Sequence, residues 1–166
     1  MSSPTTTTKP ATGSRVQRTG DAFMRRVLRS PMHRMVSGKL LIVTVIGRKS
    51  GHVYENPVGY AESDGYVLIG TAAKWYRNLR PGEPVRITLR RTVIEADWEV
   101  IREEEVAAEC YRIILEVNPT HGRFAGISLT PDGSVNRDEL RKALAAGTVV
   151  VRLTPRESWS RPLPDA

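Results

Sequence analysis

Two short segments of the 166-residue chain carry the residue types that bind small anions and flat rings. The first is the turn at residues 47–51, which places Arg48, Lys49 and Ser50 between two glycines. Glycine permits positive φ and close approach of a ligand to the backbone, and cations with a hydroxyl suit a phosphate or a carboxylate. The alternative is a charged hairpin turn that serves only solubility, and the turn residues alone do not separate the two.

The second segment, residues 74–79, follows a strand that ends at Gly70 and combines two aromatic side chains with two cations and an amide. Such a segment can stack on a planar ring and hydrogen-bond its polar edge. The alternative is a helical turn that buries Trp75 and Leu79.

Several other kinds of site lack their usual residues. The three histidines lie far apart, without cysteines at metal-binding spacing, so we expect no metal site. The chain has no dinucleotide fingerprint, no phosphate-binding P-loop and no nucleophile elbow. Its single cysteine, Cys110, excludes an intrachain disulfide and sits where a helix core is expected. Chemistry without a metal, or binding alone, remains.

The elements around these segments read as a small antiparallel barrel with packed helices, mainly β with helices (α+β). We count six antiparallel strands, and Asp64-Gly65 marks one hairpin turn. A helix is predicted over 103–117, with Val106, Cys110, Ile113 and Val117 on its apolar face. A second helix is predicted over 136–146. The strand patterns lie at residues 39–47, 53–61, 85–90, 94–100 and 148–153, and residues 62–72 read as a hairpin.

Positive charge is concentrated near the N-terminus. The chain has a formal charge of +7, yet residues 1–52 alone hold ten basic residues and one acid. We expect residues 1–20 to be a disordered tail, 21–155 a single domain that opens with a basic amphipathic helix at 21–30, and 156–166 a C-terminal tail. Arg25, Arg26 and Arg29 lie on the basic face of that helix, which suits solvent, an anionic ligand or an anionic membrane surface.

Composition also limits the location and the partners. The longest apolar run has seven residues, far short of the roughly 20 that span a membrane, and no secretory signal is visible. A cytoplasmic protein is therefore expected, with peripheral membrane contact through the basic helix. The basic arm has a single aromatic residue, Phe23, so we expect no nucleic-acid partner.

The order of the two segments along the chain, together with the strand between them, resembles a known family. GRKSG after a strand, Asn56-Pro57 on the return strand and WYRNL after the third strand together resemble the deazaflavin (F420)-dependent nitroreductase family. This family belongs to the split-barrel flavin and deazaflavin oxidoreductases. The likeness covers residues 40–89 in specific motifs and 92–155 in layout.

The resemblance implies an FMN-binding split-barrel-like fold with coenzyme F420 as cofactor and FMN as the alternative. The implied reaction is hydride transfer from reduced F420 to a small-molecule acceptor: a quinone, a nitroaromatic or an activated alkene. A monomer or a homodimer is implied. The other reading is a non-catalytic split-barrel binder of a flavin, haem or fatty acid.

The same resemblance assigns roles to residues. Arg25, Arg26 and Arg29 would contact the oligoglutamate tail of the cofactor or lipid. His121 would donate a proton, because the stretch 118–124 has no tyrosine, and the alternative is a surface histidine. The loop before Trp75 is shorter than in many members. The implied cofactor-binding residues are Arg48, Lys49, Ser50, Gly51, Tyr54, Asn56, Pro57, Val58, Thr71, Ala72, Ala73, Lys74, Trp75, Asn78 and Leu79.

Overall fold

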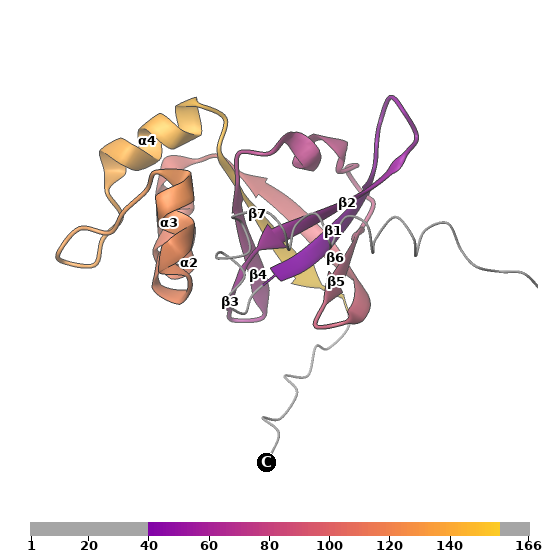
Figure 1. Ribbon diagram of the computed structural model, residues 1–166, viewed down its shortest axis with the longest axis horizontal. Coiled ribbons are helices and arrows are strands. Elements are labelled where there is room, and N and C mark those ends of the chain that lie inside the picture. The colour runs from indigo at the N-terminus through magenta and orange to yellow at the C-terminus, as the bar shows by residue number, and fades with distance from the viewer. Residues whose placement is uncertain (1–39, 157–166) are drawn as a thin grey trace, which may run out of the picture. The chain divides into compact units, whose positions relative to one another are not determined.

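The computed structural model describes residues 40–156, which form one curled antiparallel sheet with helices packed beside it (Figure 1). The strand order is β2-β1-β5-β6-β7-β4-β3. Every neighbouring pair is antiparallel. The strands are β1 (Leu40–Ile46), β2 (Val53–Gly59), β3 (Ala61–Ser63), β4 (Tyr66–Thr71), β5 (Val85–Leu89), β6 (Thr92–Ile101) and β7 (Val149–Pro155).

Alternation along β1 and β2 decides which side chains face the barrel interior. Leu41, Val43 and Val45 are buried in the core, and the residues between them face outward. The register sets Tyr54 opposite Val45 and Asn56 opposite Val43. Directly paired residues share a face, so Tyr54, Asn56 and Val58 face inward from the edge strand β2.

A second apolar core lies between the sheet and the helices α2 (Glu104–Val117), α3 (Pro119–Ala125) and α4 (Arg137–Ala145). These helices gather on one side of the sheet (Figure 1). Strand β4 separates the two cores: Val67 and Ile69 belong to the barrel interior, whereas Leu68 belongs to the helix side. Gly70 also contacts the helix side, through Tyr111 and His121.

The α+β, split-barrel-like class expected from the sequence is confirmed, but the sheet has seven strands instead of six. The seventh arises because the chain leaves the ladder at the buried Tyr60 and pairs again as β3, so the Asp64-Gly65 hairpin supplies two strands.

The apolar face predicted for the helix over 103–117 is only partly confirmed. The helix itself is confirmed as α2, capped by the Glu103 carboxylate. Cys110 is buried and Ile113 is half-buried, whereas Val106 and Val117 are exposed. Ala107 and Tyr111 are fully buried, and the Tyr111 side chain reaches β4 at Gly70.

Predictions for the termini fall mostly outside the described residues. The tail at 1–20, the helix at 21–30 with Arg25, Arg26 and Arg29, and residues 157–166 all lie there. Arg156 was expected to begin the tail, but it extends the ladder: its N–H donates to the Glu95 carbonyl and its guanidinium lies 2.7 Å from Asp97. Within residues 40–156, no helix is long and apolar enough to cross a membrane.

Candidate functional site

The turn between β1 and β2 is closed by its own backbone. The Gly47 N–H donates to the His52 carbonyl at 2.8 Å, and the Gly51 N–H donates to the Gly47 carbonyl at 2.9 Å. Gly51 has φ +67°, a conformation that strains other residues. The backbone therefore holds Lys49 and Ser50 at an exposed tip.

Ser50 and Tyr54, both predicted site residues, meet beside this turn. Their hydroxyl oxygens lie 3.1 Å apart, and Ser50 Oγ also accepts from the His52 N–H at 3.3 Å. Gly47 must be glycine for this arrangement, since a Cβ there would collide with Ser50 Oγ and lie 2.7 Å from Tyr54 Cε2.

Arg48 joins the turn to the second predicted segment, which forms the short 3-10 helix η2 (Lys74–Asn78). The Arg48 N–H donates to Asn78 Oδ1 at 3.2 Å, and the guanidinium donates to the Leu79 carbonyl at 2.6 Å. These contacts, between residues 30 and 31 positions apart in sequence, join the two segments into one site. The Arg48 side chain is occupied by this contact.

Trp75 and Leu79 are buried in the barrel core, as the alternative of a buried helical turn predicted. The indole Nε1 of Trp75 has no hydrogen-bond partner among the described residues. Stacking on a planar ring therefore requires neighbours of η2, because the faces of the Trp75 ring are already packed.

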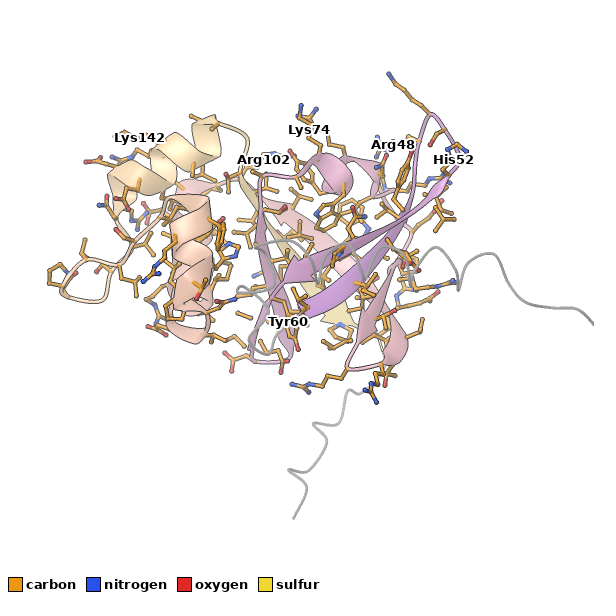
Figure 2. All side chains as sticks on the ribbon, viewed as in Figure 1. Arg48, His52, Tyr60, Lys74, Arg102 and Lys142 are labelled. Carbon is orange, nitrogen blue, oxygen red and sulfur yellow. The ribbon has the colours of Figure 1, made fainter. Side chains whose placement is uncertain are left out.

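Several cations line the edge of the barrel at η2. Lys49 and Lys74 are exposed, and neither forms an ion pair within residues 40–156. The guanidinium groups of Arg77 and Arg102 lower the pKa of the Tyr76 hydroxyl, and Arg102 lies 5.5 Å from the centre of the Tyr76 ring. Figure 2 shows Arg102, Lys74 and Arg48 along one edge. We call Arg48, Lys49, Lys74, Arg77 and Arg102 the basic rim.

The remaining predicted residues divide by position. Thr71 Oγ1 accepts from the Ala73 N–H at 3.1 Å and so shapes the loop before η2, in which Ala72 and Ala73 are exposed. The Asn56 amide donates to the Val43 carbonyl at 3.3 Å. Pro57 pairs with Ile42 on the outer face, away from Tyr54 and Val58, so the return strand does not present all its predicted residues to one ligand.

His121 lies apart from the basic rim, on α3, where its Nε2 is buried. A Cβ on Gly70 would lie 2.7 Å from this nitrogen and 2.6 Å from the hydroxyl of Tyr111. Burial lowers the pKa of His121, which is therefore neutral at pH 7, and raises the pKa of Tyr111. The expected surface histidine is wrong. The proton-donor role stays a prediction.

Sequence reasoning missed Tyr111 as a candidate. The signal was present: Ala107, Tyr111 and Ile114 follow one another at three- and four-residue spacing on α2, and all three are buried. An apolar face that starts at Val106 does not include Tyr111, so this pattern was not recognised.

The predicted residues form an open face rather than an enclosed cavity. A pocket of about 220 Å³ lies at the turn end of β1 and includes Asn78 and Leu79, the only predicted residues that line it. A second, of about 420 Å³, lies beside α3 between Leu115 and Ile127. No group of three or more metal-ligating side chains occurs within residues 40–156.

A curled antiparallel sheet of seven strands with helices packed beside it defines a split-barrel-like α+β fold. The model of the F420H2-dependent quinone reductase family matches residues 16–128. The chain belongs to that family, which confirms the resemblance in its sequence. Coenzyme F420 is the cofactor of the family.

Solved structures share the fold at low sequence identity. A protein of unknown function from Agrobacterium tumefaciens has 13% identity and a TM-score of 0.51, over 91% of this chain and 58% of that one. A conserved hypothetical protein from Mycobacterium tuberculosis has 20% identity and a TM-score of 0.49 (77% and 81%). An F420-H2 dependent reductase has 16% identity and a TM-score of 0.47 (70% and 94%). No curated protein matches the chain.

The described residues fit an anionic, ring-bearing cofactor. Lys49 and Lys74 offer cations that no acid neutralises within residues 40–156, and Ser50 adds a hydroxyl. The Nε1 of Trp75, on η2 itself, is buried and has no hydrogen-bond partner among the described residues. This donor set suits phosphate and carbonyl oxygens.

Proposed function

We propose that this chain transfers a hydride from reduced F420 to a small acceptor, a quinone, a nitroaromatic or an activated alkene. Besides family membership, the observation that supports it most is the pair of Arg48 contacts to Asn78 and Leu79. They bring an anion-binding turn and the η2 segment into one site with a basic rim, which suits a cofactor that carries both phosphate and a ring.

In this proposal, the turn holds the phosphate region. Lys49 contributes charge, Ser50 contributes a hydroxyl whose orientation Tyr54 fixes, and Gly51 lets the backbone approach. Arg48 acts as a positioning residue, because its side chain binds the Leu79 carbonyl.

The cofactor ring would be held by the inward-facing side chains of β2 and by the loop before η2. Tyr54, Asn56 and Val58 would supply the wall, and the exposed residues Ala72 and Ala73 after the half-buried Thr71 would supply backbone hydrogen-bonding groups. When bound, reduced F420 supplies the hydride, while the protein binds, orients and shields. A proton for the reduced acceptor comes from water at the open face, because His121 is neutral at pH 7 and lies on the helix side of β4.

A non-catalytic binder of a flavin, haem or fatty acid is the second candidate. It is favoured by the exposure of the β4–η2 loop, in which Ala72, Ala73 and Lys74 are all open to solvent. Such a loop shields a reaction from water less well than an enclosed pocket.

Steady-state assays with reduced F420 separate the candidates. The proposal predicts oxidation of reduced F420 in the presence of a quinone, a nitroaromatic or an activated alkene, tested one at a time. Tight binding of F420 with no oxidation by any acceptor class would instead support the binder. The oligomeric state and a cytoplasmic location stay predictions.

A further inference from the structure

The polar ends of Tyr111 and His121 meet above one glycine of the sheet. Tyr111 comes from α2 and His121 from α3, and their ring centres lie 6.0 Å apart. The Tyr111 hydroxyl and His121 Nε2 both lie within 2.7 Å of the point that a Cβ on Gly70 would occupy. Two helices thus meet at the end of β4.

Neither polar atom has a hydrogen-bond partner among the described residues, although both are buried. Leaving a buried donor or acceptor unpaired is costly. Both atoms lie over the same point of Gly70, so each is a polar group available to pair with the other.

The two groups are chemically complementary. Burial lowers the pKa of His121 and raises the pKa of Tyr111. Both side chains are neutral at pH 7. A neutral phenol donates one hydrogen bond, and a neutral imidazole protonated on Nδ1 accepts at Nε2.

We propose that the Tyr111 hydroxyl donates a hydrogen bond to His121 Nε2, and that this pair is a positioning unit that clamps β4 at Gly70. Gly70 directly precedes Thr71, Ala72 and Ala73, so the clamp fixes the loop that faces the cofactor. The hydrogen bond is independent of the proposed function. The positioning role, in contrast, rests on the proposed function.

Gly70 is part of the unit because it has no side chain. A methyl group there would lie 2.6 Å from the hydroxyl and 2.7 Å from the imidazole nitrogen, closer than such contacts normally are. Gly70→Ala must therefore push at least one ring away from β4.

Nitrogen NMR of the unliganded wild-type protein tests the bond without any substitution. The expected result is a neutral His121 protonated on Nδ1, with a Nε2 signal that shifts in Tyr111→Phe. A His121 protonated on Nε2 would overturn the proposal, because that atom would have no lone pair to accept with. A crystal structure completes the test: an oxygen–nitrogen distance below about 3.0 Å supports the bond, and a bridging water overturns it.

Thermal unfolding gives a test in which the sign of the change decides. If the bond exists, Tyr111→Phe leaves Nε2 unpaired, and Tm falls. If both atoms are unpaired, the same change removes a buried polar group, and Tm rises. Tyr66→Phe is the matched control, since Tyr66 is exposed on β4 and its ring contact with Arg152 needs no hydroxyl.

The positioning role is read from F420 titrations, not from turnover. Kd is expected to rise about fivefold in Tyr111→Phe and in Gly70→Ala, the factor that a loss of about 1 kcal/mol gives, and to stay unchanged in Tyr66→Phe. A confirmed bond with an unchanged Kd in Tyr111→Phe overturns the role. Failure of the wild type to bind F420 sinks the proposed function, while the NMR and Tm results still decide the bond.

Discussion

Arg48 and Lys49 are neighbours in sequence but have different tasks. The Arg48 guanidinium donates a hydrogen bond to the Leu79 carbonyl. Lys49, in contrast, is exposed at the tip of the turn and makes no ion pair within residues 40–156. One residue therefore holds the site together, and the other is free to meet an anion.

Lys49→Ala is expected to raise the Kd for F420 about fivefold, because it removes a cation from the proposed phosphate site while leaving the turn backbone closed. Fluorescence titration measures this. The matched control is Lys142→Ala, an exposed lysine on α4 away from the basic rim (Figure 2). Equal effects of the two substitutions would show that only the overall charge matters.

Arg48→Ala should act on stability first. It removes the bond to Leu79 and weakens the contact between the turn and η2, so the free energy of unfolding should fall by about 1–2 kcal/mol in urea. Arg123→Ala, an exposed arginine with no ion pair in the described part, should change it by less than about 0.5 kcal/mol. No loss in Arg48→Ala would contradict the bridging role.

The buried His121 predicts a particular dependence of stability on pH. Its folded pKa is lowered from the ordinary value near 6.5. Above that value both states are neutral. As pH falls below about 6.5, the unfolded chain binds a proton that the folded chain does not, so stability falls by up to about 1.4 kcal/mol per pH unit until the folded pKa is reached.

His121→Gln removes this titration, and its free energy of unfolding should change less between pH 7.5 and pH 5 than that of the wild type. The carboxylates with lowered pKa values titrate below this window. Urea unfolding at the two pH values measures the difference. Equal slopes in the two chains would mean that His121 is accessible to solvent.

At the scale of elements, the strands were predictable because their sequences alternate. Val85, Ile87 and Leu89 on β5 are buried, and the residues between them face outward, as the period-two pattern required. The residue contacts of the candidate site could not be predicted in this way. No local sequence pattern indicates that Arg48 contacts Leu79, because this contact depends on the position of the turn relative to η2.

Helix α3 is not among the helices predicted from the sequence, because it contains Pro119 and Gly122. Proline is tolerated at the first turn of a helix, where its missing N–H costs nothing. Gly122 serves close packing: a Cβ there would lie 2.5 Å from the Ile127 carbonyl oxygen and 2.8 Å from Leu115 Cδ2. Propensity alone cannot reveal such a contact.

Gly122→Ala should therefore destabilise the protein by about 1–3 kcal/mol through overpacking against backbone. Gly59→Ala is the matched control, because a Cβ there has only the Asn118 amide nitrogen nearby, at 3.8 Å, and glycine-to-alanine changes in open positions are neutral or stabilising. Thermal unfolding of the two variants compares them. Equal Tm values would contradict the packing assigned to α3.

At the scale of the whole molecule, the charge has a more specific meaning than its total. The net +7 is mostly an N-terminal excess that lies outside the described residues. Within the described part, the cations that matter gather on the basic rim, where the turn, η2 and the start of α2 meet. This arrangement, on a split-barrel fold of the F420H2-dependent quinone reductase family, is what relates the charge to a cofactor.

The most direct test is a titration of the purified full chain with F420, in parallel with FMN and haem. We predict saturable F420 binding with a Kd in the micromolar range, on the order of −8 kcal/mol, and weaker binding of the other two. Binding of FMN or haem with no response to F420 would contradict the assignment of the site.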